Sequence, residues 1–226
     1  IRVAMESRGL GDVYKRQLSP TFLPRDGITQ LVDLDCRAIP VPGPEDIEHI
    51  VAANGLVISS HLKRAPEFEE NEGQLYWLDL DEAVEAQTAV PIQTTYPANF
   101  RPPCLSFLPS ETGGTRYGIS HPGPAEPRHT IELFRLTIDG QEQRWAHTGT
   151  LTDQLLVSPN NLVALPDGTL FISNDNFDLG SPLQMGLDYV LQRQRAPLVY
   201  FNGETFTDLG QNLILGNGIT YQQEDN

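Results

Sequence analysis

The sequence predicts an all-β protein built from repeated sheets, and three observations lead to this prediction. Turn-forming residues are spread through the chain, which contains 18 prolines and 19 glycines among 226 residues,. The apolar runs are short enough to be strands, and only residues 81–87 and 183–195 could hold a few helical turns,. A unit of two strands also recurs at a period of some tens of residues, which is typical of a β-propeller.

Each repeated unit is a short strand that ends in serine or a neighbouring polar residue, then a loop, then a longer strand. Its copies are NGLVISS with GQLYWLDLD, RYGISHP with TIELFRLTIDG, and GTLFISND with APLVYFNGETF. The Ile-Ser pairs at 58, 119 and 172 are spaced 61 and 53 residues apart, about the size of a four-stranded blade with generous loops,. A β-sandwich is the alternative, but it explains the recurring unit less well.

The number of units indicates an incomplete ring. Three units are present, and NGITY (217–221) opens a fourth shortly before the sequence stops. Propellers close with about four to eight blades, because each blade buries its faces against neighbours on both sides. We therefore expect a partial propeller of about three blades plus the first strand of a fourth.

The first seventeen residues have a different character from the rest. The segment DVYKRQ (12–17) looks like the in-frame translation of a transposon end used to prepare sequencing libraries. We interpret residues 1–17 as a sequencing-adaptor scar and assign the partial propeller to residues 18–226. On this interpretation the native N-terminus, with any signal peptide, lies outside the sequence.

Charge and hydropathy exclude two classes of partner. The chain carries a net charge of −15, and residues 18–226 alone have 11 basic against 28 acidic residues, a net charge of −17. Nucleic-acid binding needs clustered Lys and Arg, so this acidic balance argues against it. The sequence shows no stretch near the roughly 18 apolar residues of a membrane span. The acidic surface is compatible with divalent cations.

Polar residues recur where successive units begin. Glu45 and Asp46 precede the first unit, Asn160 and Asn161 precede a strand of the third, and Asn217 opens the fourth. The starts of inner propeller strands converge on the central channel, and carboxylate and amide oxygens around an axis suit calcium. The alternative is that the asparagines are ordinary turn residues and that the acidic pair is a cap. Spacing alone favours that alternative.

Four segments together resemble the opening blades of the paraoxonase/arylesterase family. They are CRAIPVPGPEDIEHIVAANGLVISSHLKR, FRPPCLSFLPSETGGTRYGISHPGPAEPRHTIELFRL, SPNNLVALPDGTLFISND and GNGITY, and the similarity covers nearly all of residues 36–221. The resemblance implies a six-bladed propeller with two calcium ions in its channel and an activity that hydrolyses lactones and aryl esters. The sequence shows no G-x-S-x-G or H-E-x-x-H motif, so serine-nucleophile chemistry is not supported,.

The resemblance also implies roles for individual residues. Glu45, Asn160 and Asn217 match ligands of the catalytic calcium. Ligands of a second, structural calcium are matched by Asp46, the carbonyl of Leu105 and Asn161. The family usually has aspartate at the position of Asn161, so the second site has one negative charge fewer and is expected to be weaker or empty.

The proton-transfer residues depart from the family pattern. A histidine pair is proposed to activate water in the family, and His121 matches its outer member. Pro103 stands at the inner position, and Asn176 replaces a third histidine of the pocket. A structural role for His121 at a strand end is the alternative. We expect the other histidines to be surface residues, namely His49, His61, His129 and His147.

The two cysteines indicate a compartment only through the resemblance. Cys36 falls where the family has a cysteine that bridges to the last blade, and such a bridge would favour a periplasmic or extracellular location. Its partner would lie outside the sequence. We expect Cys104 to be a small buried residue rather than a nucleophile.

Three hypotheses follow for the parent protein. The first is a calcium-dependent arylesterase or lactonase acting on a small-molecule substrate, of which this piece alone would be inactive. The second is a gluconolactonase-like propeller that uses a different metal and acts on sugar lactones, given the replaced histidines. The third is a non-catalytic binding propeller whose channel metal is structural. The oligomeric state cannot be predicted.

Overall fold

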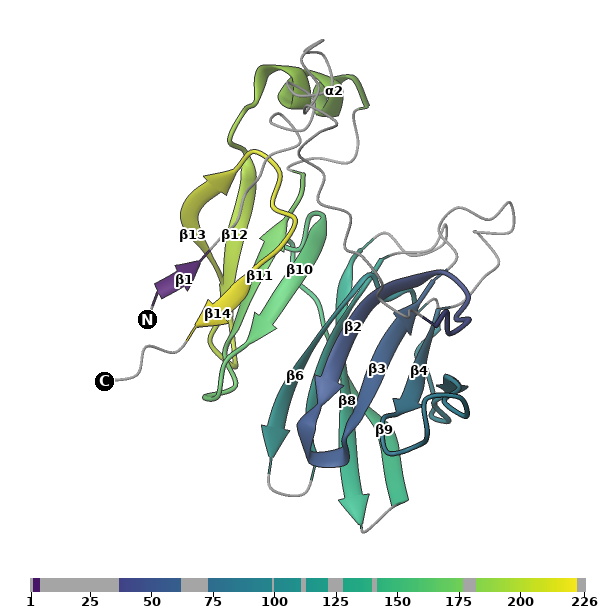
Figure 1. Ribbon diagram of the computed structural model, residues 1–226. Helices are drawn as coiled ribbons and strands as arrows, with labels where there is room; N and C mark the ends of the chain where they lie inside the picture. Colours follow the sequence, from purple (N-terminus) through teal and green to yellow (C-terminus); the bar gives the residue numbers. More distant parts are fainter. Residues whose placement is uncertain are drawn as a thin grey trace.

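The structure is a computed structural model, and it is built almost wholly of β-strands (Figure 1). It describes residues 2–4, 37–61, 73–98, 100–110, 113–121, 128–139, 142–176 and 182–222. Most of the described strands belong to three antiparallel sheets of four strands each. The predicted all-β class is therefore confirmed.

Each sheet is formed by four strands in the order in which they follow along the chain. The first sheet contains β2 (Pro44–Ile50), β3 (Gly55–Ser60), β4 (Gln74–Asp79) and β5 (Val90–Pro91). The second contains β6 (Cys104–Ser110), β7 (Gly113–Ser120), β8 (Thr130–Asp139) and β9 (Glu142–Leu151). The third contains β10 (Pro159–Ala164), β11 (Leu170–Asn174), β12 (Ala196–Phe201) and β13 (Phe206–Leu213).

The repeated sequence unit corresponds to the second and third strands of every sheet. The isoleucines of the three Ile-Ser pairs lie on β3, β7 and β11 and are 5%, 0% and 0% exposed. The serines that follow them, Ser59, Ser120 and Ser173, are equally buried. Strands covered on both faces lose the simple alternation of apolar and polar residues, which is why these strands read as nearly continuous apolar runs.

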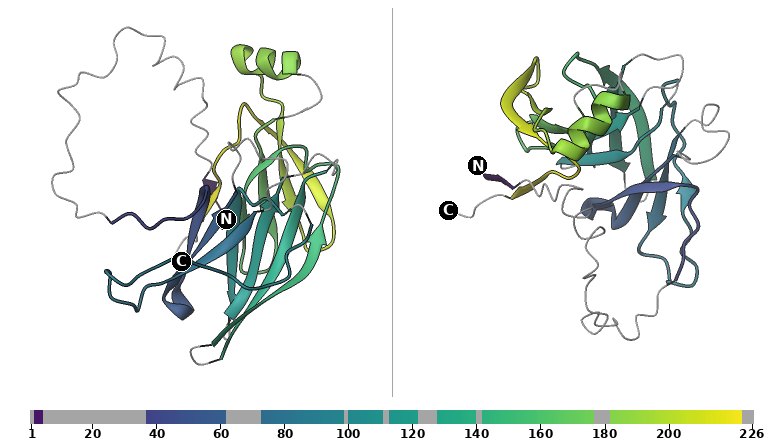
Figure 2. Two further views of the ribbon diagram at one scale, coloured as in Figure 1. Left: turned by 90° about the vertical axis from the view of Figure 1, so that its right-hand side faces the viewer. Right: turned by 90° about the horizontal axis from the view of Figure 1, so that it is seen from above.

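The sheets pack side by side through their first strands. Strand β6 contacts β2 of the first sheet and β10 of the third. Seen from above, the three sheets follow one another in an arc (Figure 2). One apolar core, which includes Trp77 and Phe134, lies between the first and second sheets. A second core, which includes Ile119 and Ile172, lies between the second and third.

The fourth unit predicted at 217–221 is present only as the short strand β14 (Thr220–Gln222). It contacts β10, so the succession β2, β6 and β10 continues to β14. Its ladder partner is β1 (Arg2–Ala4), a strand that falls within the segment interpreted as a scar. The remainder of that segment lies outside the described residues, and its interpretation stays a prediction.

The helical expectations are confirmed only in part. Helix α2 (Pro182–Leu191) joins β11 to β12 and is the only α-helix in the described ranges. Residues 81–87 form turns instead, because so short a segment gains too few hydrogen bonds to offset nucleation of a helix,. A single 3-10 turn, η2 (Val51–Ala53), joins β2 to β3. Within the described part of the chain, none of the helices has the length and apolarity needed to cross a membrane.

Candidate functional site

Two β-bulges of the same geometry begin the first strands of the first and third sheets. In β2 the register passes from Pro44 opposite Ser60 to Asp46 opposite Ser59, which leaves Glu45 as the extra residue,. In β10 the register passes from Pro159 opposite Asn174 to Asn161 opposite Ser173, which leaves Asn160 as the extra residue. The pairs predicted from the sequence therefore occupy equivalent places in two sheets.

A serine on the opposing strand holds each bulge in this geometry. The backbone N–H of Asp46 donates to Oγ of Ser59 at 3.0 Å. In the third sheet, Oγ of Ser173 donates to the carbonyl of Asn161 at 3.3 Å. In the first and third sheets, the serine of the Ile-Ser pair thus holds the first strand beside the bulge.

The second sheet begins differently. Its first strand is preceded by Pro102 and Pro103, which have no N–H to donate. The serine of this sheet, Ser120, instead accepts from the N–H of Arg101 at 2.9 Å. Over its described residues β6 pairs with β7 without a register shift. The bulge motif therefore occurs on either side of β6, in β2 and β10.

Asp46 joins the first bulge to the neighbouring sheet. Its Oδ2 accepts the N–H of Leu105 at 2.8 Å, and its Oδ1 accepts the N–H of Ile47 at 2.9 Å. Asp46 and Leu105, two of the three residues predicted for the second metal site, are thus in contact. The contact is made by the N–H of Leu105, whereas the predicted ligand is its carbonyl. The Leu105 carbonyl lies 3.6 Å from Sγ of Cys104.

Glu48 repeats this contact two residues further along β2. Its Oε1 accepts the N–H of Phe107 at 2.7 Å, and its Oε2 lies 2.8 Å from Nη1 of Arg116. The Arg116 side chain is fully buried, and its guanidinium lies over the rings of Phe107 and Trp145. The junction of β2 with β6 is therefore made by carboxylates.

Asn160 is oriented by a carboxylate that the sequence analysis did not select. Its Nδ2 donates to Oδ2 of Asp175 at 3.4 Å. Oδ1 of Asp175 accepts from Ser158 Oγ and, at 3.0 Å, from Nδ2 of Asn176. A carboxylate can only accept, so the amide nitrogen of Asn160 must face Asp175 and its Oδ1 must face away. The sequence feature that could have indicated this carboxylate is Asn174-Asp175, the pair directly after the Ile-Ser of the third unit.

Asn217 is placed at the same end of the third sheet by the glycine before it. The N–H of Gly216 donates to the carbonyl of Asn174, the last residue of β11, at 3.2 Å. A Cβ at Gly216 would lie 2.6 Å from that carbonyl oxygen, so only glycine fits. Asn217 and Glu45 are exposed, and Asn160 is half-buried. These side chains therefore reach the surface at the end where β2 and β10 begin.

His121 lies at this end as well, directly after β7. Its backbone N–H donates to the carbonyl of Arg101 at 3.2 Å. Its Nε2 lies 3.1 Å from the carbonyl oxygen of Pro159, the residue before Asn160. The imidazole rings of His121 and His129 are in edge-to-face contact, with their centroids 4.9 Å apart.

The prediction that the other histidines are surface residues is wrong for two of them. His61 and His129 are 2% and 6% exposed. The backbone N–H of His61 donates to the carbonyl of Gly43 at 2.8 Å, and the ring of His129 packs against that of His121. His147 is half-buried, and its Nε2 lies 2.9 Å from Oε2 of Glu132. His49 is exposed, as predicted.

The prediction for Cys104 is confirmed. The residue is 1% exposed. Burial, and secondarily the negative charge of Asp46, raise the pKa of its thiol, so the nucleophilic thiolate is disfavoured,. Cys36 lies outside the described residues.

The chemistry of this end of the sheets is that of oxygen donors. Over the described ranges, no three side chains of the His, Cys, Asp and Glu types come together as a metal cluster. The predicted ligands combine carboxylates with amides and a backbone carbonyl, a mixed oxygen set of the kind that hard cations take. Asn160 fits such a role, because its oxygen is directed away from Asp175.

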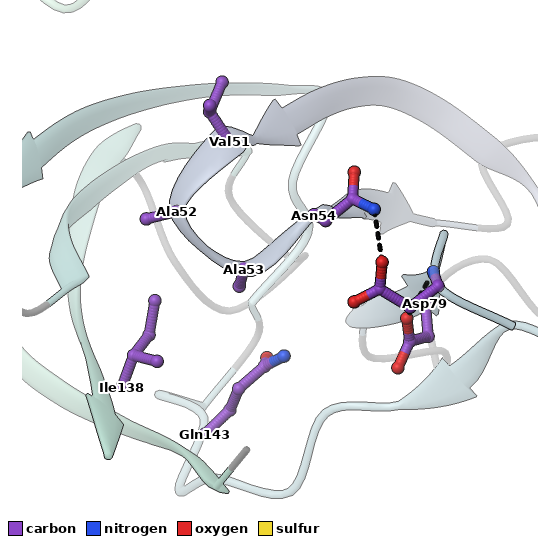
Figure 3. Close-up of a pocket in the computed structure, with 8 residues that line it drawn as sticks. Val51, Ala52, Ala53, Asn54, Asp79, Ile138 and Gln143 are labelled. Carbon is purple, nitrogen blue, oxygen red and sulfur yellow. Dashed lines mark hydrogen bonds between the residues drawn. The ribbon is translucent and has the colours of Figure 1, made fainter. Parts of the chain in front are cut away.

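A cavity lies at the opposite end of the sheets (Figure 3). It has a volume of about 440 Å³, and its lining includes Ala53 and Asn54 from the β2–β3 connection, Ile138 from β8 and Gln143 from β9. Nδ2 of Asn54 donates to Oδ1 of Asp81 at 2.6 Å beside it. None of the predicted site residues lines this cavity.

Comparison with known proteins identifies the family. The family model described as Arylesterase matches residues 38–226. Serum paraoxonase/arylesterase 2 of Rattus norvegicus is 26% identical over 199 residues, which cover 83% of this chain and 53% of the relative. Serum paraoxonase/lactonase 3 of Oryctolagus cuniculus is 25% identical, over 79% of this chain and 50% of the relative. This chain spans about half the length of these relatives. The chain therefore belongs to the arylesterase family.

Proposed function

We propose that this protein is a calcium-dependent hydrolase of aryl esters or lactones. In this proposal the sheets are blades of a six-bladed β-propeller, of which the chain supplies about three and the first strand of a fourth. The names of the relatives, which include an arylesterase and a lactonase, support the reaction class. The observation that carries the proposal is the pair of bulges that present Glu45 and Asn160 on either side of β6.

Glu45, Asn160 and Asn217 would hold the catalytic calcium. One carboxylate and two amides would supply oxygen ligands, and the bond from Nδ2 of Asn160 to Asp175 leaves its Oδ1 for that role,. Asp46, the Leu105 carbonyl and Asn161 would hold the second ion. When bound, calcium supplies a positive charge that polarises the substrate carbonyl and stabilises the developing oxyanion.

His121 is the residue that we propose as the general base. The Pro159 carbonyl can only accept a hydrogen bond, so Nε2 of His121 must carry the proton,. Nδ1 then carries the lone pair and is the nitrogen that can take a proton from water. The same contact ties the orientation of the base to the residue that precedes Asn160.

The test is metal removal from the full-length protein. Hydrolysis of phenyl acetate and of a panel of lactones is measured before chelation, after chelation, and after addition of calcium, zinc or manganese. We expect chelation to abolish turnover, calcium to restore it, and calcium also to raise the melting temperature. Turnover that is indifferent to chelation would contradict the proposal.

A second candidate is favoured by one observation, the presence of Pro103 and Asn176 where the resemblance implies histidines. It is a gluconolactonase-like hydrolase of sugar lactones with a different metal. Restoration by zinc or manganese, but not by calcium, together with turnover of sugar lactones alone, would favour it. A metal that raises the melting temperature while no ester or lactone is turned over would favour a non-catalytic binding propeller.

A further inference from the structure

The cavity at the end opposite the candidate metal ligands is not used by the proposed function. The turn that carries Ala52 and Ala53 forms one side of it, and Ile138 and Gln143 lie across from this turn (Figure 3). Its volume of about 440 Å³ falls within the range of small-molecule sites, which is about 300–1,000 Å³,. The lining residues all belong to the first two sheets and the connections between their strands.

One part of the lining is apolar. Ala53 and Ile138 pack against the apolar core between the first and second sheets. Val51 also lines the cavity, and it is 78% exposed. An aliphatic chain in the cavity would cover these side chains and remove apolar surface from water.

The polar part of the lining consists mainly of hydrogen-bond acceptors. Oδ1 of Asp79 accepts the N–H of Asp81 at 2.8 Å, and Oδ1 of Asp81 accepts from Nδ2 of Asn54 at 2.6 Å. Within the described ranges, no donor reaches the second oxygen of either carboxylate or Oδ1 of Asn54. A ligand for these atoms has to be a donor, because carboxylate and amide oxygens can only accept.

The cavity is also negatively charged. Asp79 and Asp81 line it, and none of its lining residues is basic. Arg144 follows the lining residue Gln143, but successive side chains of a strand point to opposite faces, and Nη2 of Arg144 lies 2.9 Å from Oε2 of Glu142,. The lining therefore attracts a cation and contains no positive group that would take the place of one.

We propose that this cavity binds a short aliphatic amine in its ammonium form. The ammonium group has three N–H donors, and the two carboxylates and the Asn54 oxygen are the matching acceptors. The alkyl chain would lie against Ala53 and Ile138. The inference does not depend on the proposed function, because none of the predicted metal ligands lines the cavity.

The combination of charge with an apolar wall distinguishes this site from an ordinary acidic surface. An acidic surface attracts every small cation alike, whatever the length of its alkyl chain. A cavity with an apolar wall gains affinity with each methylene that it covers. The dependence of affinity on chain length therefore separates the two cases.

The first test titrates the full-length protein with ethyl-, propyl-, butyl- and pentylammonium and follows binding by ligand-observed NMR. Ammonium chloride supplies the charge without the chain, and pentan-1-ol supplies the chain without the charge. The salt concentration is about 150 mM, which screens exposed charges beyond about 8 Å. We expect affinity to rise about two- to fourfold for each methylene. Pentylammonium should bind at least about tenfold more tightly than either ammonium or pentan-1-ol.

Two variants remove the two features of the site separately. Asp79→Asn keeps an oxygen that can accept the Asp81 N–H but removes a charge. Ala52→Leu keeps both carboxylates but fills part of the cavity, and Ala52 is exposed, so the larger side chain does not crowd the core. We expect each change to weaken pentylammonium binding by about tenfold. Melting temperatures show whether the variants are folded.

The matched control is Glu142→Gln, which removes an exposed acidic side chain at the same end of the sheets. Its affinity for pentylammonium should stay within about twofold of the parent. An affinity that does not change with chain length would overturn the inference. Equal binding of pentan-1-ol and pentylammonium, or equal losses in Asp79→Asn and Glu142→Gln, would overturn it as well. These titrations need neither calcium nor an ester, so their outcome is separate from that of the proposed function.

Discussion

The bulges at the starts of β2 and β10 have the same register, but the first carries acidic side chains and the second carries neutral amides. Both follow a proline, and both lie opposite the serine of an Ile-Ser pair. The first carries Glu45 and Asp46, whereas the second carries Asn160 and Asn161. The comparison teaches that the backbone geometry comes from the proline and the strand register, and that the two residues after the proline decide charge.

The strands behind the bulges are anchored to β6 in different ways. Strand β2 is held by the carboxylates of Asp46 and Glu48, which bind backbone N–H groups of β6. Strand β10 is held by a neutral contact, in which the N–H of Ala164 donates to Oγ of Ser106 at 3.0 Å. One side of β6 is therefore a charged junction and the other a neutral one.

The largest effect is expected from Glu48→Ala, which breaks the charged junction. The change leaves the fully buried Arg116 without its carboxylate, which costs about 3–5 kcal/mol of unfolding free energy,. The matched control is Glu142→Ala, since Glu142 and Arg144 form a pair in which both side chains are 72% exposed. Its loss should cost under about 1 kcal/mol by denaturant unfolding. Equal effects of the two changes would contradict this account of the junction.

Glu45→Gln makes the first bulge resemble the second, because it replaces a carboxylate by an amide of the same shape. Loss of a ligand charge should weaken calcium binding by about 100-fold, with kcat falling at limiting calcium. Calorimetric titration measures the affinity, and Glu204→Gln on an exposed turn is the control. Calcium affinity within a factor of about two of the parent would exclude Glu45 as a ligand.

Asn161→Asp makes the opposite change, because it gives the second bulge one carboxylate. We expect calcium affinity at the second site to rise by about tenfold, the smallest of the three effects. A calcium-dependent rise in melting temperature larger than that of the parent would report it. The control is Asn202→Asp, on the β12–β13 turn away from the bulges. A variant that binds calcium no better than its parent would argue against a second site at Asn161.

Much of the fold could be predicted from the sequence, because the second and third strands of each sheet are strongly apolar and recur. The positions of Glu45 and Asn160 followed from the same repeat. The bulges themselves could not be predicted, since they depend on the register between strands rather than on either strand alone. The helical turns expected at residues 81–87 are absent. Local composition does not reveal whether a short segment has a surface on which to pack.

The side chains around the site were harder to predict. Asp175 directly follows β11 and meets Asn160 only after β10 and β11 pair. The burial of His129 depends on the return of β8 along β7, which places it against His121. Both contacts join residues more than seven positions apart, so motifs made of neighbouring residues in the sequence do not reveal them.

The carboxylate contacts between β2 and β6 also occupy hydrogen-bonding groups on an edge strand, because β6 is the first strand of its sheet. An open strand edge presents unpaired N–H groups that invite a strand from another molecule. On β6, the N–H groups of Leu105 and Phe107 are instead taken by Asp46 and Glu48. An intruding strand would have to displace two acidic side chains and leave Arg116 without its partner. The same carboxylates that join two sheets thus make the addition of another strand at this edge of β6 costly,.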